Sequence, residues 1–150
     1  MNEETESYSM ILWLVWGALL FSMLIYMMVP AMIPPPPDHQ PMELAEGNPP
    51  KLAIILGVAS IVLIPMLFSL RKRMFFEPVG EKCAPGSTEA HAAYFTMSLT
   101  TWVLCELVGV FGFAVYFLSY SLVWSVPFAV MGMILLLIFR PEPDAAEAEV

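Results

Sequence analysis

Four long runs of apolar residues, separated by polar segments, dominate the pattern of this chain. The runs cover residues 10–29, 52–70, 92–118 and 120–139. A helix rises about 1.5 Å per residue, so each run approaches or exceeds the roughly 30 Å thickness of a bilayer's hydrocarbon core. Apolar runs of this length are typical of membrane spans. The pattern therefore predicts an all-α integral membrane protein with four transmembrane helices.

Prolines and a short link predict where these helices end. Pro30 and the four consecutive prolines at 34–37 should end the first helix, because proline lacks an N–H and clashes with the preceding turn. We expect residues 34–50 to form a stiff loop. Pro65 lies inside the second run and predicts a kink there. The link at residues 119–121 is so short that the third and fourth helices should form a tight antiparallel hairpin.

The composition excludes an ordinary soluble domain. The chain is 59% hydrophobic and 13% charged, whereas soluble domains average about 45–50% and about 25%. Its ten Phe, four Trp and twelve Met are more bulk than a soluble fold of 150 residues could hide from water. Six Lys and Arg provide no basic face for nucleic acid. We therefore expect the lipid bilayer, and no nucleic acid, to be a partner.

Basic residues beside the runs predict the orientation in the membrane. Four spans would place both termini and the 71–91 segment on one side, with five of the six positive residues, and Lys51 alone on the other. Cytoplasmic loops carry an excess of Lys and Arg. We predict a plasma-membrane or inner-membrane protein with an acidic cytoplasmic N-terminus over residues 1–9 and an acidic, disordered tail over 140–150. The five positive residues are Arg71, Lys72, Arg73, Lys82 and Arg140.

The basic trio at residues 71–73 has two readings. It could attract anionic lipid, at about 1 kcal/mol per basic residue near the surface. A simple flank that stops the second span explains the same residues with fewer assumptions.

No known catalytic or metal-binding motif is visible in the sequence. Cys83 and Cys105 fall in a loop and in the middle of a span, so they cannot pair within this topology. His39 and His91 lie on opposite sides of the predicted membrane. Neither a zinc or haem constellation nor a Ser/His/Asp set is apparent. We expect no enzymatic activity, no cofactor and no metal.

Glu106 is the one charged residue within the four runs. It lies fourteen residues after Ala92 and twelve before Leu118, which is about 21 Å and 18 Å along a helix and therefore near the bilayer midplane. An ionised carboxylate there costs about 2.5–3.5 kcal/mol on insertion scales. We therefore expect Glu106 to face a partner side chain, a cavity or another subunit.

Small side chains beside Glu106 predict close packing of the third and fourth helices, because they let membrane helices approach closely and form interhelical hydrogen bonds. Thr100, Thr101 and Ser125 are the expected partners of the carboxyl group, and Cys105 is a further candidate for a buried polar or ion-binding site. The helix-packing strips consist of Ser98, Thr101, Cys105, Gly109 and Gly112 on the third helix and of Ser125, Ala129 and Gly132 on the fourth.

Residues 104–113, with the sequence LCELVGVFGF, resemble the carboxylate helix of rotary ATPase proteolipid subunits, particularly of the vacuolar type. That family has an acid followed by two apolar residues, a small residue, an aliphatic residue, Tyr or Phe, Gly and an apolar residue. Glu106 stands at the family's ion-carrying acid, and Phe111 and Gly112 stand at its aromatic–glycine pair. The resemblance implies that Glu106 carries H⁺ or Na⁺. The rest of the chain does not match the family.

Two hypotheses about function follow from Glu106. In the first, the chain is an accessory or assembly subunit of a larger membrane complex, or a homo-oligomer, and Glu106 makes a buried structural hydrogen bond. In the second, the chain is a proteolipid-like coupling protein that uses Glu106 to take up and release H⁺ or Na⁺. The spans contain no basic side chain to stabilise an ionised carboxylate, and this favours the structural role.

Overall fold

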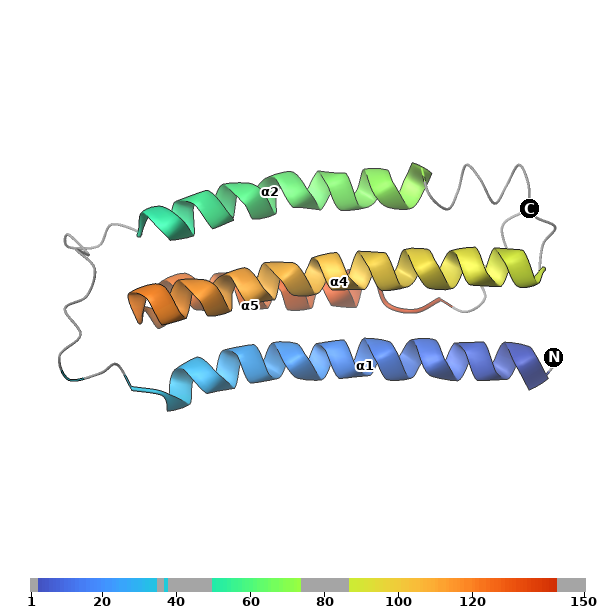
Figure 1. Ribbon diagram of the computed structural model, residues 1–150, viewed down its shortest axis with the longest axis horizontal. Helices are drawn as coiled ribbons and strands as arrows, with labels where there is room; N and C mark the ends of the chain where they lie inside the picture. Colours follow the sequence, from blue (N-terminus) through green and yellow to red (C-terminus); the bar gives the residue numbers. More distant parts are fainter. Residues whose placement is uncertain (1–2, 35–36, 38–49, 74–86, 143–150) are drawn as a thin grey trace.

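The computed structural model of the protein describes residues 3–34, 37, 50–73 and 87–142, and this part of the chain is helical without strands (Figure 1). The helices are α1 (Glu3–Met32), α2 (Lys51–Arg71), α4 (Thr88–Ser119) and α5 (Leu122–Ile138). α4 and α5 form the centre of the molecule, and α1 and α2 pack on opposite sides of this pair. The predicted all-α architecture is confirmed.

The hairpin between α4 and α5 is confirmed by a two-residue link. Tyr120 adopts a left-handed backbone conformation with φ 50°, and its N–H donates to the carbonyl of Tyr116. A residue in this conformation commonly ends a helix and reverses the chain. Only Ser121 then separates Tyr120 from the first residue of α5. The two helices therefore lie antiparallel and pack closely along their lengths.

Small residues explain how closely α4 and α5 approach each other. A Cβ atom added to Gly112 would lie 2.6 Å from the Ser125 carbonyl oxygen and 2.8 Å from Cβ of Phe128. A Cβ atom on Gly132 would lie 3.0 Å from the Cys105 carbonyl oxygen. The two distances at Gly112 are shorter than packing of a Cβ atom allows, and the distance at Gly132 is tighter than most Cβ contacts, so glycine at both positions lets the two backbones lie in contact.

The helix bounds differ in detail from those expected. α1 begins at Glu3 rather than at residue 10, and it continues through Pro30 to Met32. The prediction that Pro30 ends this helix is therefore wrong. Pro30 removes one N–H donor, but Ile33 N still donates to the Val29 carbonyl and closes the final turn. Most of the 34–50 loop, the 74–86 segment with Cys83, and residues 143–150 of the tail lie outside the described residues.

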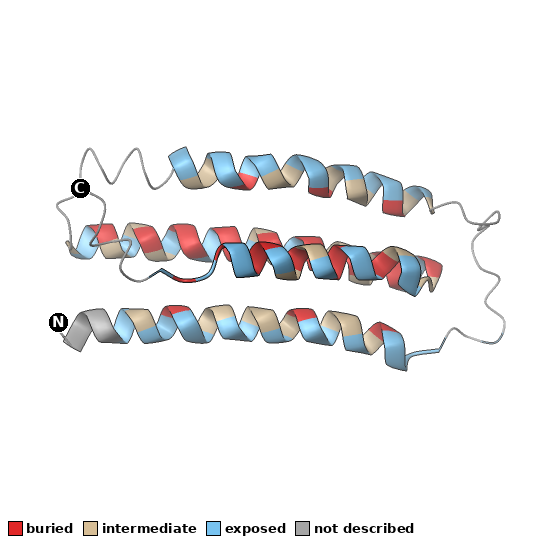
Figure 2. Cartoon of the chain, turned by 180° about the vertical axis from the view of Figure 1, so that it is seen from behind, coloured by how far each residue is buried: buried red, intermediate tan, exposed pale blue. Residues whose placement is uncertain are grey.

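Three helices, α1, α2 and α4, are long and apolar enough to cross a membrane, and α5 is shorter with 17 residues. Burial follows the arrangement of the helices: Figure 2 shows buried positions concentrated on the central pair and mostly exposed positions on α1 and α2. On α2 the only buried residues are Ala53, Ser60 and Leu67, one on every second turn. The outward faces are apolar, as expected for helices surrounded by lipid.

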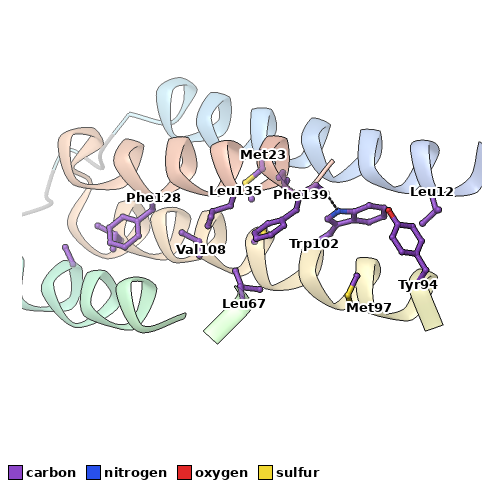
Figure 3. Packing of buried hydrophobic residues seen from close by; sticks show 14 residues of the cluster. Leu12, Met23, Leu67, Tyr94, Met97, Trp102, Val108, Phe128, Leu135 and Phe139 are labelled. Atoms are coloured by element: carbon purple, nitrogen blue, oxygen red, sulfur yellow. Dashed lines mark hydrogen bonds between the residues drawn. The ribbon is translucent and has the colours of Figure 1, made fainter. Parts of the chain in front are cut away.

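α2 and α5 end close to each other, α2 somewhat further along the bundle, and α1 and α4 continue beyond both (Figure 1). The Arg71 guanidinium at the end of α2 lies 5.3 Å from the centre of the Phe139 ring at the end of α5. The Trp102 indole N–H donates to the Phe139 carbonyl, so the end of α5 meets α4 at Trp102 (Figure 3). Residues of α4 before Trp102 therefore extend past the end of α5.

Candidate functional site

The Glu106 side chain is held by two hydroxyl groups of α1. Ser22 Oγ lies 2.5 Å and Tyr26 Oη 3.1 Å from the same carboxyl oxygen, Oε1. Ser22 and Tyr26 are one helical turn apart, so both point from the same face of α1 toward α4. The cluster therefore joins α1 to α4 through side chains that are 84 and 80 residues away from Glu106 in the sequence.

A chain of hydrogen bonds extends from the carboxyl group to the α1 backbone. Ser22 Oγ also lies 2.9 Å from the Leu19 carbonyl oxygen. A hydroxyl group has one proton and can also accept, so Ser22 can donate to Leu19 while it accepts from a protonated Glu106. It can instead donate to an ionised Glu106. The neutral acid, which hydrocarbon favours, is thus hydrogen-bonded within the chain.

The second carboxyl oxygen, Oε2, is in a different situation. Within the described part of the chain it has no hydrogen-bond partner. It is also not among the side-chain polar atoms that are enclosed without a partner. Glu106 itself is half-buried. Oε2 therefore reaches the surface of the chain along the line where α1 and α4 meet, which we call the α1–α4 seam.

Packing beside the acid is tight because a methionine fills the space that two glycines leave without side chains. Met23, next to Ser22 in the sequence, is fully buried. Cβ atoms added to Gly109 or Gly132 would overlap its sulfur or methyl group. Met23 thus lies where α1, α4 and α5 meet (Figure 3). Tyr26 is held further by the Phe113 ring, with 5.5 Å between ring centres.

Contacts across the bundle show that Glu106 of α4 lies at about the same level as the middle of α2. On one side of Glu106, the Phe128 side chain lies near both Gly57 of α2 and Gly112 of α4. On the other side, Phe139 contacts Phe68 of α2 and its carbonyl is bonded to Trp102 of α4. The 21 residues of α2 are about 31 Å long, close to the thickness of a hydrocarbon core, so Glu106 would lie near the midplane of a bilayer that α2 crosses.

The partners expected for the carboxyl group were wrong. Thr101 and Thr100 donate to the carbonyls of Met97 and Thr96, each at 2.8 Å, and Ser125 donates to Leu122 at 3.3 Å. These hydroxyls bond to carbonyls of their own helices, as Ser and Thr commonly do in apolar surroundings. Successive helical residues differ by 100° in direction, so Glu106 turns away from the Cys105 face that meets α5.

Sequence reasoning missed Ser22 and Tyr26, although a signal for them existed. They are the only residues with hydroxyl groups in the run 10–29, and they stand four positions apart. A pair with this spacing lies on one helix face. The missing information was which helix that face would meet.

The small residues predicted to pack α4 against α5 lie in two interfaces, one with α5 and one with α1. Gly112 contacts α5, whereas Gly109 is covered mainly by Met23 and Tyr26 of α1. Ser98, Thr101, Cys105, Ser125 and Ala129 are all buried. No group of three metal-ligating side chains occurs in the described part of the chain.

Comparisons of the chain with protein-family models, with curated proteins and with solved structures found no match. The chemistry of the Glu106 cluster is therefore the guide to function. Its arrangement allows two kinds of behaviour: a fixed hydrogen bond between helices, or exchange of a proton or cation at a carboxyl group that reaches the surface.

Proposed function

We propose that this protein is a four-span membrane protein, with both termini in the cytoplasm, that serves as an accessory or assembly subunit of a larger membrane complex. In this proposal α5 is the fourth span, and Glu106 is a structural group that fixes α1 against α4. The excess of basic residues on the side of Arg71 and Arg140 supports the orientation. The resemblance to proteolipid subunits is then a local similarity in α4.

One observation supports the structural role: both hydrogen-bond partners of Glu106 come from a single neighbouring helix of the same chain. A neutral carboxyl group can donate to Ser22 and accept from Tyr26, so with these hydrogen bonds made inside the chain it needs no ion. The interaction also fixes how far α1 is rotated and how deep it sits, because Ser22 and Tyr26 must stand opposite Glu106. Polar contacts of this kind hold membrane helices together where apolar packing alone does not distinguish one face from another.

The open Oε2 atom supports a role in assembly. An acceptor at the midplane that faces lipid finds no donor there, because hydrocarbon offers no hydrogen bonds. A transmembrane helix of another subunit, lying along the α1–α4 seam, could donate to it. Val103, one turn before Glu106, is 52% exposed on this part of α4. The seam is thus the surface where we expect a second subunit.

Photocross-linking in native membranes tests this proposal. We would introduce a photoreactive amino acid at Val103 and, as a control, at Val58 of α2, which is 57% exposed. We expect a discrete protein adduct from position 103 and none from 58. The adduct should weaken when Glu106→Leu is added. Lipid adducts alone from both positions would contradict the assembly role.

A second candidate function, ion coupling, is favoured by the convergence of oxygen atoms. Glu106, Ser22 and Tyr26 bring a carboxyl group and two hydroxyl groups together, and part of the carboxyl group reaches the surface. Labelling of Glu106 by dicyclohexylcarbodiimide separates the two functions. Protection by Na⁺ or by raised pH would support ion coupling. Labelling that neither condition alters would support the structural role.

A further inference from the structure

Two helices that are distant in sequence bring their basic ends together at one end of the molecule. α2 ends with Arg71, followed by Lys72 and Arg73, and α5 is followed by Phe139 and Arg140. The Arg71 guanidinium lies 5.3 Å from the centre of the Phe139 ring, directly beside Arg140 in the chain. A flank that stops the second span explains the three basic residues 71–73, but it does not explain why Arg140 lies at the same end of the molecule.

The aromatic side chains beneath this cluster hold it in place. Phe139 is buried, and its ring lies 5.0 Å from the Phe68 ring of α2. A guanidinium stacked on an aromatic face keeps its N–H donors available at the edge of the plane. Arg71 is thus restrained, while Lys72, Arg73 and Arg140 are exposed.

The cluster is not neutralised by the described protein groups around it. None of the four basic side chains forms an ion pair with an acid in the part of the chain that the structure describes. Two carbonyls at this end, which could also attract cations, accept hydrogen bonds from indole groups. Trp102 donates to the Phe139 carbonyl and Trp16 to the Leu136 carbonyl. Glu142 is the nearest described acid in sequence, and its backbone N–H is held by Tyr94 Oη.

The cluster also lies at the depth of lipid headgroups. α2 has 21 residues between Lys51 and Arg71, or about 31 Å, which matches the hydrocarbon core. Arg71 and Arg140 therefore reach the boundary between hydrocarbon and headgroups. α4 continues past the ends of α2 and α5 (Figure 1).

We propose that Arg71 and Arg140, with Lys72 and Arg73, form a binding site for the phosphodiester headgroup of an anionic glycerophospholipid. Basic residues between the cytoplasmic ends of membrane helices bind such headgroups, through Coulomb attraction and through the paired N–H donors of arginine. The lipid joins α2 to α5 at this end of the molecule. Contacts between α2 and α5 are otherwise few, so the bound lipid should stabilise the position of α2.

The test is native mass spectrometry of the full chain, together with thermal unfolding, in a mild detergent titrated with phosphatidylglycerol or phosphatidylcholine. We expect phosphatidylglycerol alone to remain bound and to raise the Tm. Arg140→Gln should weaken its apparent affinity about fivefold, and the double variant Arg71→Gln/Arg140→Gln about 25-fold, since each basic residue contributes about 1 kcal/mol. Arg140 is exposed, so its replacement should leave the fold unchanged.

Lys51→Gln is the matched control, because it removes one positive charge from the other end of α2. It should bind phosphatidylglycerol as the wild type does. Equal loss of affinity in Lys51→Gln and Arg140→Gln would overturn the proposal, because the effect would then follow net charge. Inorganic phosphate that raises the Tm as much as the lipid does, at equal concentration, would also overturn it in favour of a site for free anions.

Discussion

A carboxyl group in hydrocarbon is stable only where neighbouring groups replace the hydrogen bonds of water. Glu106 meets this condition on one of its two oxygens, through Ser22 and Tyr26 of α1. The two hydroxyls determine the geometry of the carboxyl group and leave the other oxygen open. At the scale of single residues, the central question is whether the cluster needs a hydrogen-bonding side chain or an ionisable one.

Glu106→Gln and Glu106→Leu distinguish these requirements. Glutamine keeps the size and the hydrogen bonds to Ser22 and Tyr26, so in the structural role it should leave the Tm almost unchanged. Leucine removes the partner of both hydroxyls, which should cost about 1–3 kcal/mol of stability. The measurement is thermal unfolding in detergent of protein purified from the membrane fraction.

Ser22→Ala provides the internal control for this pair. If the serine and the acid stabilise the protein through one contact, the double variant Ser22→Ala/Glu106→Leu should lose less stability than the two single losses added together. A Gln variant that is folded and inserted normally, but loses function as completely as the Leu variant, would favour the ion-carrying role.

At the scale of elements, the interface between α1 and α4 depends on glycine. Gly109 and Gly132 leave the space that Met23 fills, and Met23 is fully buried there. Two more contacts join α1 to the rest of the bundle: Trp16 donates to the Leu136 carbonyl, and the Ile33 carbonyl accepts from Tyr116 Oη. α1 is thus held near its middle and at its end, although most of its surface is exposed.

Gly109→Leu should weaken this interface. The new side chain would occupy the space of the Met23 sulfur, and such overpacking costs about 1–3 kcal/mol or more. We expect a clear fall in the unfolding temperature in detergent. Leu107→Ile is the control, because Leu107 is 37% exposed on the opposite side of α4. Equal unfolding temperatures for the two variants would show that Gly109 does not support packing.

At the scale of the whole molecule, the helices form a central antiparallel pair with one helix on either side. Because α1 and α2 do not enclose the pair completely, α4 and α5 keep exposed apolar faces of their own. Lys51 lies at one end of this arrangement and Arg71 with Arg140 at the other. The distribution of positive charge then predicts which end faces the cytoplasm.

Cysteine labelling tests this topology. Cysteines would be introduced singly at positions 44 and 84, in a background with Cys83 and Cys105 replaced, and intact cells would be treated with an impermeant maleimide. We expect position 44 to react and position 84 to react only after permeabilisation, because four spans place the two positions on opposite sides. Labelling of both positions in intact cells would contradict the four-span arrangement.

The sequence by itself determined the number of helices in the described part of the chain and their order, and it placed Glu106 near the middle of the third. These properties depend on local information: the length of an apolar run and its flanking residues. The short link at residues 119–121 was sufficient to predict the α4–α5 hairpin, because two helices with so little chain between them must lie side by side. The end of α1 was misjudged, because a helix near its last turn tolerates Pro30.

Only the tertiary structure decided which faces meet. A membrane helix is apolar toward lipid and toward its neighbours alike, so hydrophobic periodicity does not mark its buried side. Ser22 and Tyr26 were therefore visible in the sequence without a partner, and the small-residue strip of α4 was assigned to α5 alone. The contact of Arg71 with Phe139, the neighbour of Arg140 in the chain, was hidden for the same reason. It depends on how the ends of α2 and α5 pack against each other, which no local pattern specifies.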